Sequence, residues 1–95
     1  MEESFLEREC RRVVHDLGGF TRKQDVGPRA KGWPDMAIWL PGGLHVIVEF
    51  KTHVGVLSPM QEARKTEFER VGFEVHVIRC LADFKRLMKK LGATT

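Results

Sequence analysis

The sequence predicts a small α/β domain whose elements follow in the order helix, three strands, helix, strand, helix. The chain has 95 residues, enough for one modest hydrophobic core and too few for two. Segments with apolar residues at three- and four-residue spacing alternate with short runs rich in Val and Ile, which is typical of helices and strands respectively. A Pro-Gly-Gly turn between two such runs indicates a β-hairpin. Residues 1–95 are therefore expected to form a single domain.

The first half of the chain is expected to hold one helix and three strands. Residues 3–17 place apolar side chains on one helical face, and Gly18-Gly19 ends the helix. Residues 20–23 are expected to form a short strand, followed by a loop over 25–34 that is rich in Gly and Pro. Strands are expected over 35–40 and 44–52, on either side of the turn at 41–43.

The second half predicts a helix, a strand and a last helix. Ser58 can cap a helix, Pro59 suits its first position, and the helix is expected to end at Val71 before Gly72. A strand over 73–79 should return to the sheet by a right-handed crossover, which makes the sheet mixed. A last amphipathic helix over 81–91 is closed by Gly92.

Composition and charge exclude several classes of protein. Lys and Arg number 16 and Asp and Glu 13, so the net charge of +3 permits a nucleic-acid partner but is too small to hold DNA by charge alone. No apolar run approaches the ~20 residues of a membrane span, and the N-terminus does not resemble a signal peptide. We therefore expect a cytoplasmic protein with no membrane partner. The two cysteines, Cys10 and Cys80, cannot make a four-ligand zinc site and are expected to be buried and reduced.

Three polar residues at the ends of the hairpin strands indicate chemistry. Around a turn centred on residue 42, Asp35 should face Glu49, so two carboxylates meet at the open end of the hairpin. Two carboxylates make an oxygen-rich site for a hard cation such as Mg²⁺, with the Phe50 carbonyl as a plausible third ligand. Lys51 points to the same face as Glu49 and could orient a water or neutralise charge on a phosphate.

Other interpretations of these residues stay open. Glu49 and Lys51 could form a surface ion pair, although the apolar Val46-Ile47-Val48 run argues against a solvated edge strand. Gln61 lies three residues after Ser58, so it could complete a capping box, orient a water or phosphate, or do both. Glu7 lies at the border of the apolar face of the first helix, where it could reach the metal or simply remain solvated.

Basic and aromatic residues near this site suggest contacts to nucleic acid. A cluster precedes the hairpin and is either a phosphate-binding surface or a solvated loop: it comprises Arg22, Lys23, Arg29 and Lys31. His53 is the histidine near enough to Lys51 to contact a substrate. Trp33 and Trp39 could stack on bases or pack at a dimer interface.

Taken together, these motifs resemble the VRR-NUC (virus-type replication-repair nuclease) domain of the PD-(D/E)xK nuclease superfamily, in its stand-alone phage type. The resemblance covers about 80 residues and rests on five segments: Leu17-Gly18-Gly19, Gly32-x-Pro34-Asp35, the Leu-Pro-Gly-Gly turn at 40–43, Val48-Glu49-x-Lys51 and Leu57-Ser58-Pro59-x-Gln61. It implies a three-layer PD-(D/E)xK nuclease-like core.

The resemblance also implies a role for each site residue. Asp35, Glu49 and the Phe50 carbonyl would bind a divalent metal, Mg²⁺ with Mn²⁺ able to substitute. Lys51 would position the attacking water, and Gln61 would be an accessory active-site residue. Glu7 would be the first-helix glutamate that joins the metal site, with Glu3 and Glu9 as alternatives. The resemblance to the stand-alone members further implies a homodimer that cuts branched DNA.

Three functions follow as hypotheses. The first is a metal-dependent, structure-selective DNA endonuclease acting on four-way junctions or flaps. The second is a non-catalytic DNA-binding module that keeps the nuclease fold. The third is a sequence-specific nuclease of the restriction type, which would need more recognition surface than a chain of 95 residues readily provides.

Overall fold

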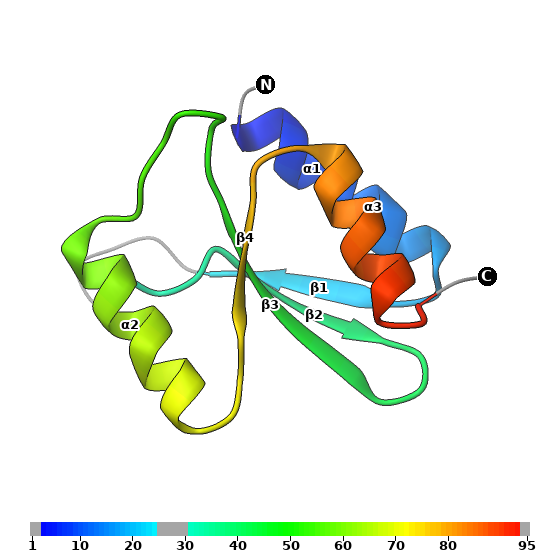
Figure 1. The fold of residues 1–95 in the computed structure, drawn as a ribbon. Helices are drawn as coiled ribbons and strands as arrows, with labels where there is room; N and C mark the ends of the chain where they lie inside the picture. Colours follow the sequence, from blue (N-terminus) through cyan, green and yellow to red (C-terminus); the bar gives the residue numbers. More distant parts are fainter. Residues whose placement is uncertain (1–2, 25–30, 94–95) are drawn as a thin grey trace.

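The computed structural model describes residues 3–24 and 31–93 as three helices around one four-stranded sheet (Figure 1). Helices α1 and α3 lie on one face of the sheet, and α2 lies on the other. The elements follow in the predicted order: α1 (Glu3–Asp16), β1 (Phe20–Lys23), β2 (Met36–Leu40), β3 (Leu44–Phe50), α2 (Pro59–Arg70), β4 (Val75–Ile78) and α3 (Leu81–Lys90). The predicted three-layer α/β class is confirmed.

The sheet is mixed, with strand order β1-β2-β3-β4. Strands β1, β2 and β3 pair antiparallel, and β4 pairs parallel to β3 after the crossover through α2. Met36 faces Val48 and Leu40 faces Leu44 across the hairpin. This is the register predicted from the turn at 41–43, and it brings Asp35 and Glu49 to the same end of the sheet.

Three strands are shorter than the sequence predicted. β2 begins at Met36 instead of residue 35, β3 ends at Phe50 instead of 52, and β4 covers 75–78 instead of 73–79. The hairpin pairing stops at Met36 and Val48, because the next even-numbered amide of β3, that of Phe50, donates to the Asp35 carboxylate instead of to backbone. A side chain thus replaces the backbone partner at the end of the ladder.

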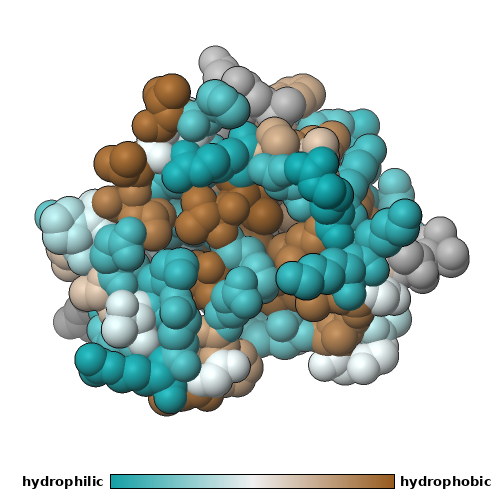
Figure 2. All heavy atoms as spheres, viewed as in Figure 1, coloured by the Kyte–Doolittle hydropathy of each residue, from teal (hydrophilic) through white to brown (hydrophobic). Residues whose placement is uncertain are grey.

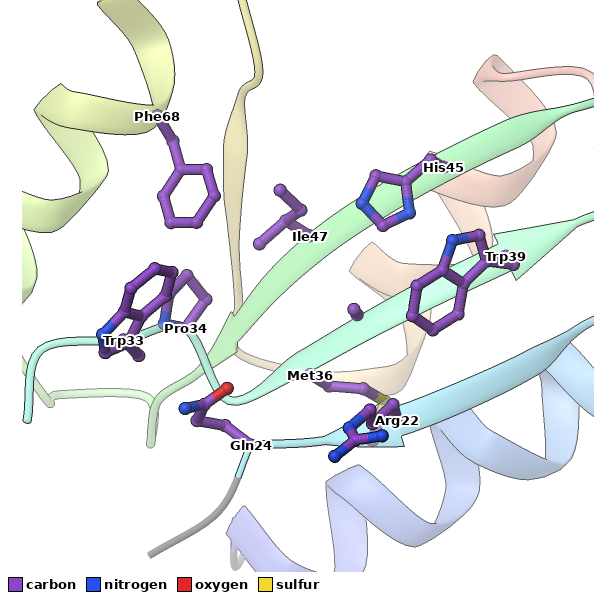
Figure 3. Close-up of a pocket in the computed structure, with 10 residues that line it drawn as sticks. Arg22, Gln24, Trp33, Pro34, Met36, Trp39, His45, Ile47 and Phe68 are labelled. Carbon is purple, nitrogen blue, oxygen red and sulfur yellow. The ribbon is translucent and has the colours of Figure 1, made fainter. Parts of the chain in front are cut away.

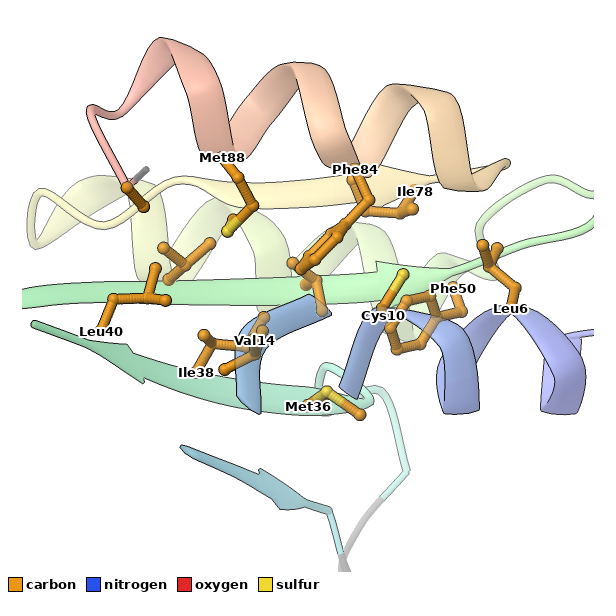
Figure 4. Packing of buried hydrophobic residues seen from close by; sticks show 13 residues of the cluster. Leu6, Cys10, Val14, Met36, Ile38, Leu40, Phe50, Ile78, Phe84 and Met88 are labelled. Atoms are coloured by element: carbon orange, nitrogen blue, oxygen red, sulfur yellow. The ribbon is translucent and has the colours of Figure 1, made fainter. Parts of the chain in front are cut away.

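The hydrophobic core lies between the sheet and the α1–α3 layer (Figure 4). Even-numbered residues of β2 and β3 face it, and of these Ile38 and Val48 are fully buried while Leu44 is partly buried. Phe84 and Met88 of α3 pack against them. Cys10 also lies in this core, and burial raises the pKa of its thiol to about 12. That thiol is therefore a small apolar side chain rather than a nucleophile.

Helix α2 is attached differently, because none of its 12 residues is buried. Its N-terminus is capped by Ser58, and its first turn packs against the loop that leads into β2. A Cβ atom on Gly32, where φ is +80°, would lie 2.7 Å from the Met60 carbonyl oxygen. Only glycine permits both that backbone angle and that approach, so Gly32 sets the spacing between α2 and the loop carrying Asp35.

In the described part of the chain, no helix is long and apolar enough to cross a bilayer. Among the most exposed apolar side chains are Val54 and Val56, in the loop ahead of α2. Figure 2 shows hydrophobic side chains at the surface over that loop and again in the centre of the view.

Candidate active site

Asp35 sits at the end of the hairpin, where its side chain takes the place of a strand partner. Its Oδ2 atom accepts a hydrogen bond of 2.7 Å from the Phe50 amide, and its carbonyl accepts one of 2.8 Å from the Gln24 amide. Its carboxylate is thereby fixed against the last residue of β3. A strand residue directs its N–H and C=O toward the same neighbour, so the Phe50 carbonyl faces the same edge as Asp35.

Glu49 and Lys51 lie on the other face of β3 from the core residues Val48 and Phe50, as strand alternation requires. Glu49 is only 3% exposed, which is unusual for a carboxylate. Lys51 is half-buried, and its amide donates to the Ile78 carbonyl at 3.1 Å. This bond extends the β3–β4 pairing one residue beyond the strand and fixes the backbone from which the lysine projects.

The donor set at this edge fits a hard divalent cation. Asp35 and Glu49 supply carboxylate oxygens and Phe50 a carbonyl oxygen, which are the ligand types that Mg²⁺ and Mn²⁺ prefer. Mg²⁺ in particular is bound by one or two carboxylates while keeping several waters. Within residues 3–24 and 31–93, no three Asp, Glu, His or Cys side chains converge where a metal could sit. The two strand carboxylates are thus the cluster on which the metal prediction depends.

Glu7 lies at the same end of the sheet but is engaged by cations. Its Oε1 atom is 3.3 Å from Nη1 of Arg11 and 3.3 Å from Nζ of Lys23, and the residue is 9% exposed. Lys23 pairs with Met36, next to Asp35, which places Glu7 over the start of β2. Its role as a ligand remains a prediction. The alternative Glu9 pairs with Arg12 at 3.7 Å, and the side chain of Glu3 is outside the described residues.

The basic cluster predicted ahead of the hairpin is divided between two faces. Adjacent strand residues point in opposite directions, so Lys23 turns to α1 and Glu7 while Arg22 lines the sheet face on the α2 side. Lys31 and His53 are exposed. Arg29 lies outside the described residues. Arg22 therefore faces the side of Glu49 and Lys51 and Lys23 faces α1, and the contact of these residues with a phosphate stays a prediction.

Gln61 forms the capping box that the sequence offered as one of its roles. Its amide N–H donates to Ser58 Oγ at 3.1 Å, and its Oε1 accepts from the Ser58 amide at 2.8 Å. The side-chain oxygen is thus occupied by the helix cap, which leaves the Nε2 amide group as the part that could donate to a water or a phosphate.

Gln61→Glu separates these two roles. Glutamate completes a capping box as well as glutamine does, so the melting temperature should stay within a degree or two of wild type. Loss of the Nε2 donor and gain of a negative charge should slow DNA cleavage about tenfold or more. Thermal unfolding and single-turnover cleavage measure the two effects. Unchanged cleavage would assign Gln61 to the cap alone, and Gln61→Ala is the control that should lose about 1 kcal/mol of stability.

Arg79 is a positioning residue that sequence reasoning missed. Its Nη1 atom donates to the carbonyls of Thr52 at 2.8 Å and Gly55 at 2.6 Å, so it holds the loop that carries Lys51 and His53. The feature that could have identified it is the parallel β3–β4 register. Phe50 pairs with Ile78, so Arg79, the residue after β4, must lie beside Lys51. That register becomes visible only when the crossover strand is placed next to β3.

Comparison with known proteins agrees with this fold. A family model for the VRR-NUC domain matches residues 2–81. A solved structure described as a VRR_NUC domain superposes with a TM-score of 0.82 at 26% sequence identity, covering 92% of this chain and 94% of that one. No curated protein matches the sequence significantly.

The matched region contains α1, the hairpin with Asp35 and Glu49, and α2. The same residues carried the resemblance found in the sequence, and the hairpin register brings two of them, Asp35 and Glu49, to one end of the sheet. The chain belongs to the VRR-NUC domain family, which makes it a nuclease domain of the PD-(D/E)xK type.

Proposed function

We propose that this protein is a divalent-metal-dependent DNA endonuclease that acts on branched DNA, such as four-way junctions or flaps. The observation that carries the proposal is the Asp35 carboxylate held against the end of β3 by the Phe50 amide. It brings two carboxylates and a half-buried lysine to one edge of the sheet. Phosphodiester hydrolysis needs that combination of cation ligands and a positive group near the phosphate.

Each residue has a distinct task in the proposed reaction. Asp35, Glu49 and the Phe50 carbonyl would hold Mg²⁺, or Mn²⁺ in its place. The bound cation would lower the pKa of a water and neutralise charge on the phosphate. Lys51 orients the attacking water and stabilises the charge that develops on the phosphate oxygens. Arg22, Lys31 and His53 contact the DNA backbone, which fits recognition of shape rather than sequence.

The test compares DNA structures under identical conditions. Four-way junctions, flaps, nicked duplexes and linear duplexes are incubated with protein and Mg²⁺ or Mn²⁺, with EDTA as the control. We expect cleavage within the branched substrates and at least tenfold slower cleavage of linear duplex. Binding without cleavage under every metal would support a non-catalytic DNA-binding module instead, and one defined cut in a linear duplex would support a restriction-type nuclease.

We also propose that the protein acts as a homodimer in the cytoplasm. Two symmetric cuts across a four-way junction require two active sites, and one described chain offers a single carboxylate pair at a single sheet end. Sedimentation equilibrium of the protein with and without junction DNA measures the assembly. A monomer in both states would restrict the activity to single cuts, as at flaps.

A further inference from the structure

The sheet face on the α2 side contains an open hollow of about 200 Å³. Its two walls are made of flat rings, as Figure 3 shows. Trp33 and Phe68 form one wall, and Trp39 and His45 form the other. Ala37 and Ile47 lie between them on β2 and β3, and Arg22 and Gln24 of the β1 segment border the opening. We call this site the aromatic hollow.

The aromatic hollow exists because α2 does not close this face of the sheet. No α2 residue is buried. Phe68 of α2 contacts Trp33, with the two ring centroids 5.5 Å apart and the ring planes nearly perpendicular. Arg64 covers the outer side of Trp33, 4.4 Å from its ring centre. This wall is therefore set by cation–π and edge-to-face contacts rather than by core packing.

The opposite wall is also built from stacked rings. The Trp39 and His45 rings lie 5.1 Å apart, and Phe20 stacks on Trp39 at 5.4 Å. His45 Nδ1 lies 3.1 Å from the Ile38 carbonyl oxygen, which fixes the ring orientation. Phe20 is 67% exposed, so the row of rings continues from the hollow to the surface at β1.

The chemistry of the lining suits a planar heterocycle with polar edges. Aromatic rings on two sides favour stacking, while Arg22 and Gln24 at the opening can donate to ring nitrogens and carbonyl oxygens. The volume is below the roughly 300–1,000 Å³ of typical small-molecule pockets, which limits the occupant to one or two rings. A purely apolar partner surface would leave the guanidinium and the amide without hydrogen-bond partners.

The hollow is adjacent to the candidate active site. Pro34 and Trp33 of its wall directly precede Asp35, and the Gln24 amide donates to the Asp35 carbonyl at 2.8 Å. Ile47 lies two residues before Glu49 on the same face of β3, about 7 Å along the strand. A nucleotide whose phosphate lay at the carboxylates would thus have its base within reach of the hollow.

From these observations we propose that the aromatic hollow receives one unstacked nucleobase of the DNA substrate, next to the phosphate that is cut. The inference rests on the proposed nuclease function and deepens it, because it names the feature recognised in the DNA. Bases of an intact duplex are paired and stacked, and extracting one costs a few kcal/mol. Junction centres and flaps present unpaired or weakly stacked bases, so the hollow would select them without reading sequence.

The test fills the aromatic hollow with a larger side chain and, separately, removes the unpaired base from the DNA. Ala37→Phe adds a ring between the walls, and Ala82→Phe adds the same ring on the exposed surface of α3, on the opposite side of the sheet. Both variants and wild type are assayed on two flaps that differ only in an abasic position at the unpaired nucleotide beside the branch. We expect removal of the base to slow wild type and Ala82→Phe about tenfold. Ala37→Phe should be slow on both flaps and show no difference between them.

A binding assay makes the result independent of cleavage. With 2-aminopurine at the unpaired position, ring stacking should quench fluorescence on binding to wild type and to Ala82→Phe, but not to Ala37→Phe. If no DNA is cut and the quenching still depends on residue 37, the proposed nuclease function fails and the hollow stands. If Ala37→Phe matches wild type in both assays, the hollow does not bind a base.

Two further measurements complete the test. Thermal unfolding checks that Ala37→Phe is folded, and Phe68→Ala, which removes one ring of the wall without entering the sheet, replaces it if it is not. Phe68→Ala should also weaken the quenching and reduce the difference between the two flaps. A change in solution mass with Ala37→Phe, without dependence on the base, would identify the face as a contact between two copies and overturn the proposal.

Discussion

Replacing Lys51 by alanine is expected to slow DNA cleavage about 1,000-fold while leaving DNA binding within a few-fold of wild type. The side chain projects from the end of β3 beside Glu49, and its backbone is fixed to Ile78. Removal of a single positioned donor that stabilises transition-state charge costs about 100- to 1,000-fold, and loss of water orientation adds to this. Single-turnover cleavage of a branched substrate in saturating Mg²⁺ measures the rate, and anisotropy measures binding.

The matched control removes an equal charge elsewhere. Lys89→Ala changes an exposed lysine on α3, on the opposite side of the sheet, and should cleave like wild type. Asp35→Asn is the companion variant, because an asparagine oxygen can still accept from the Phe50 amide while the negative charge is lost. It should lose both cleavage and Mn²⁺ binding by calorimetry. Equal rates for wild type and Lys51→Ala would remove the lysine from the mechanism.

The second large effect concerns stability. Phe84→Ala should lower the free energy of unfolding by about 3–5 kcal/mol, because Phe84 is fully buried against the sheet in the α1–α3 layer (Figure 4). For a domain of this length the whole free energy of unfolding is only about 5–14 kcal/mol. The melting temperature of Phe84→Ala should therefore fall by more than about 10 °C. Urea unfolding followed by circular dichroism measures the free energy, and a thermal melt measures the midpoint.

Phe73→Ala is the control for that prediction. Phe73 follows α2 and is 46% exposed, and its ring lies edge-on to the His45 ring, with 6.2 Å between the centroids. Its removal should cost less than about 1 kcal/mol. Similar losses for the two variants would mean that α3 does not form the core layer described above.

Much of the fold could be predicted because it depends on short-range patterns. The turn at 41–43 and the two-residue period of the strands determine the β2–β3 register, so spacing along the chain is enough to place Asp35 opposite Glu49. The same period places Val48 and Phe50 on the opposite face of β3 from Glu49, and both lie in the core. The predicted strand ends were less accurate. The β2–β3 ladder ends where the Asp35 carboxylate accepts a hydrogen bond from the Phe50 amide, and the periodicity of the sequence does not reveal that contact.

The site was predictable only in part, for a related reason. Asp35, Glu49 and Lys51 come from one hairpin, so local spacing brings them together. Glu7 joins that end of the sheet from a helix, and its pairing with Lys23 depends on how α1 packs across β1. Arg79 reaches the Lys51 loop through the parallel register of β4.

By itself the sequence determined the order of the elements, the hairpin register and the family to which the chain belongs. All of these follow from side-chain periodicity, turn residues and motifs that span a few residues. The tertiary structure alone decided that Arg22 and Lys23 point to opposite faces of the sheet, and that Arg79 holds the loop after Lys51. It also decided that α2 leaves an aromatic hollow beside Asp35. These depend on contacts between segments distant in the chain, whose geometry is set by packing rather than by spacing.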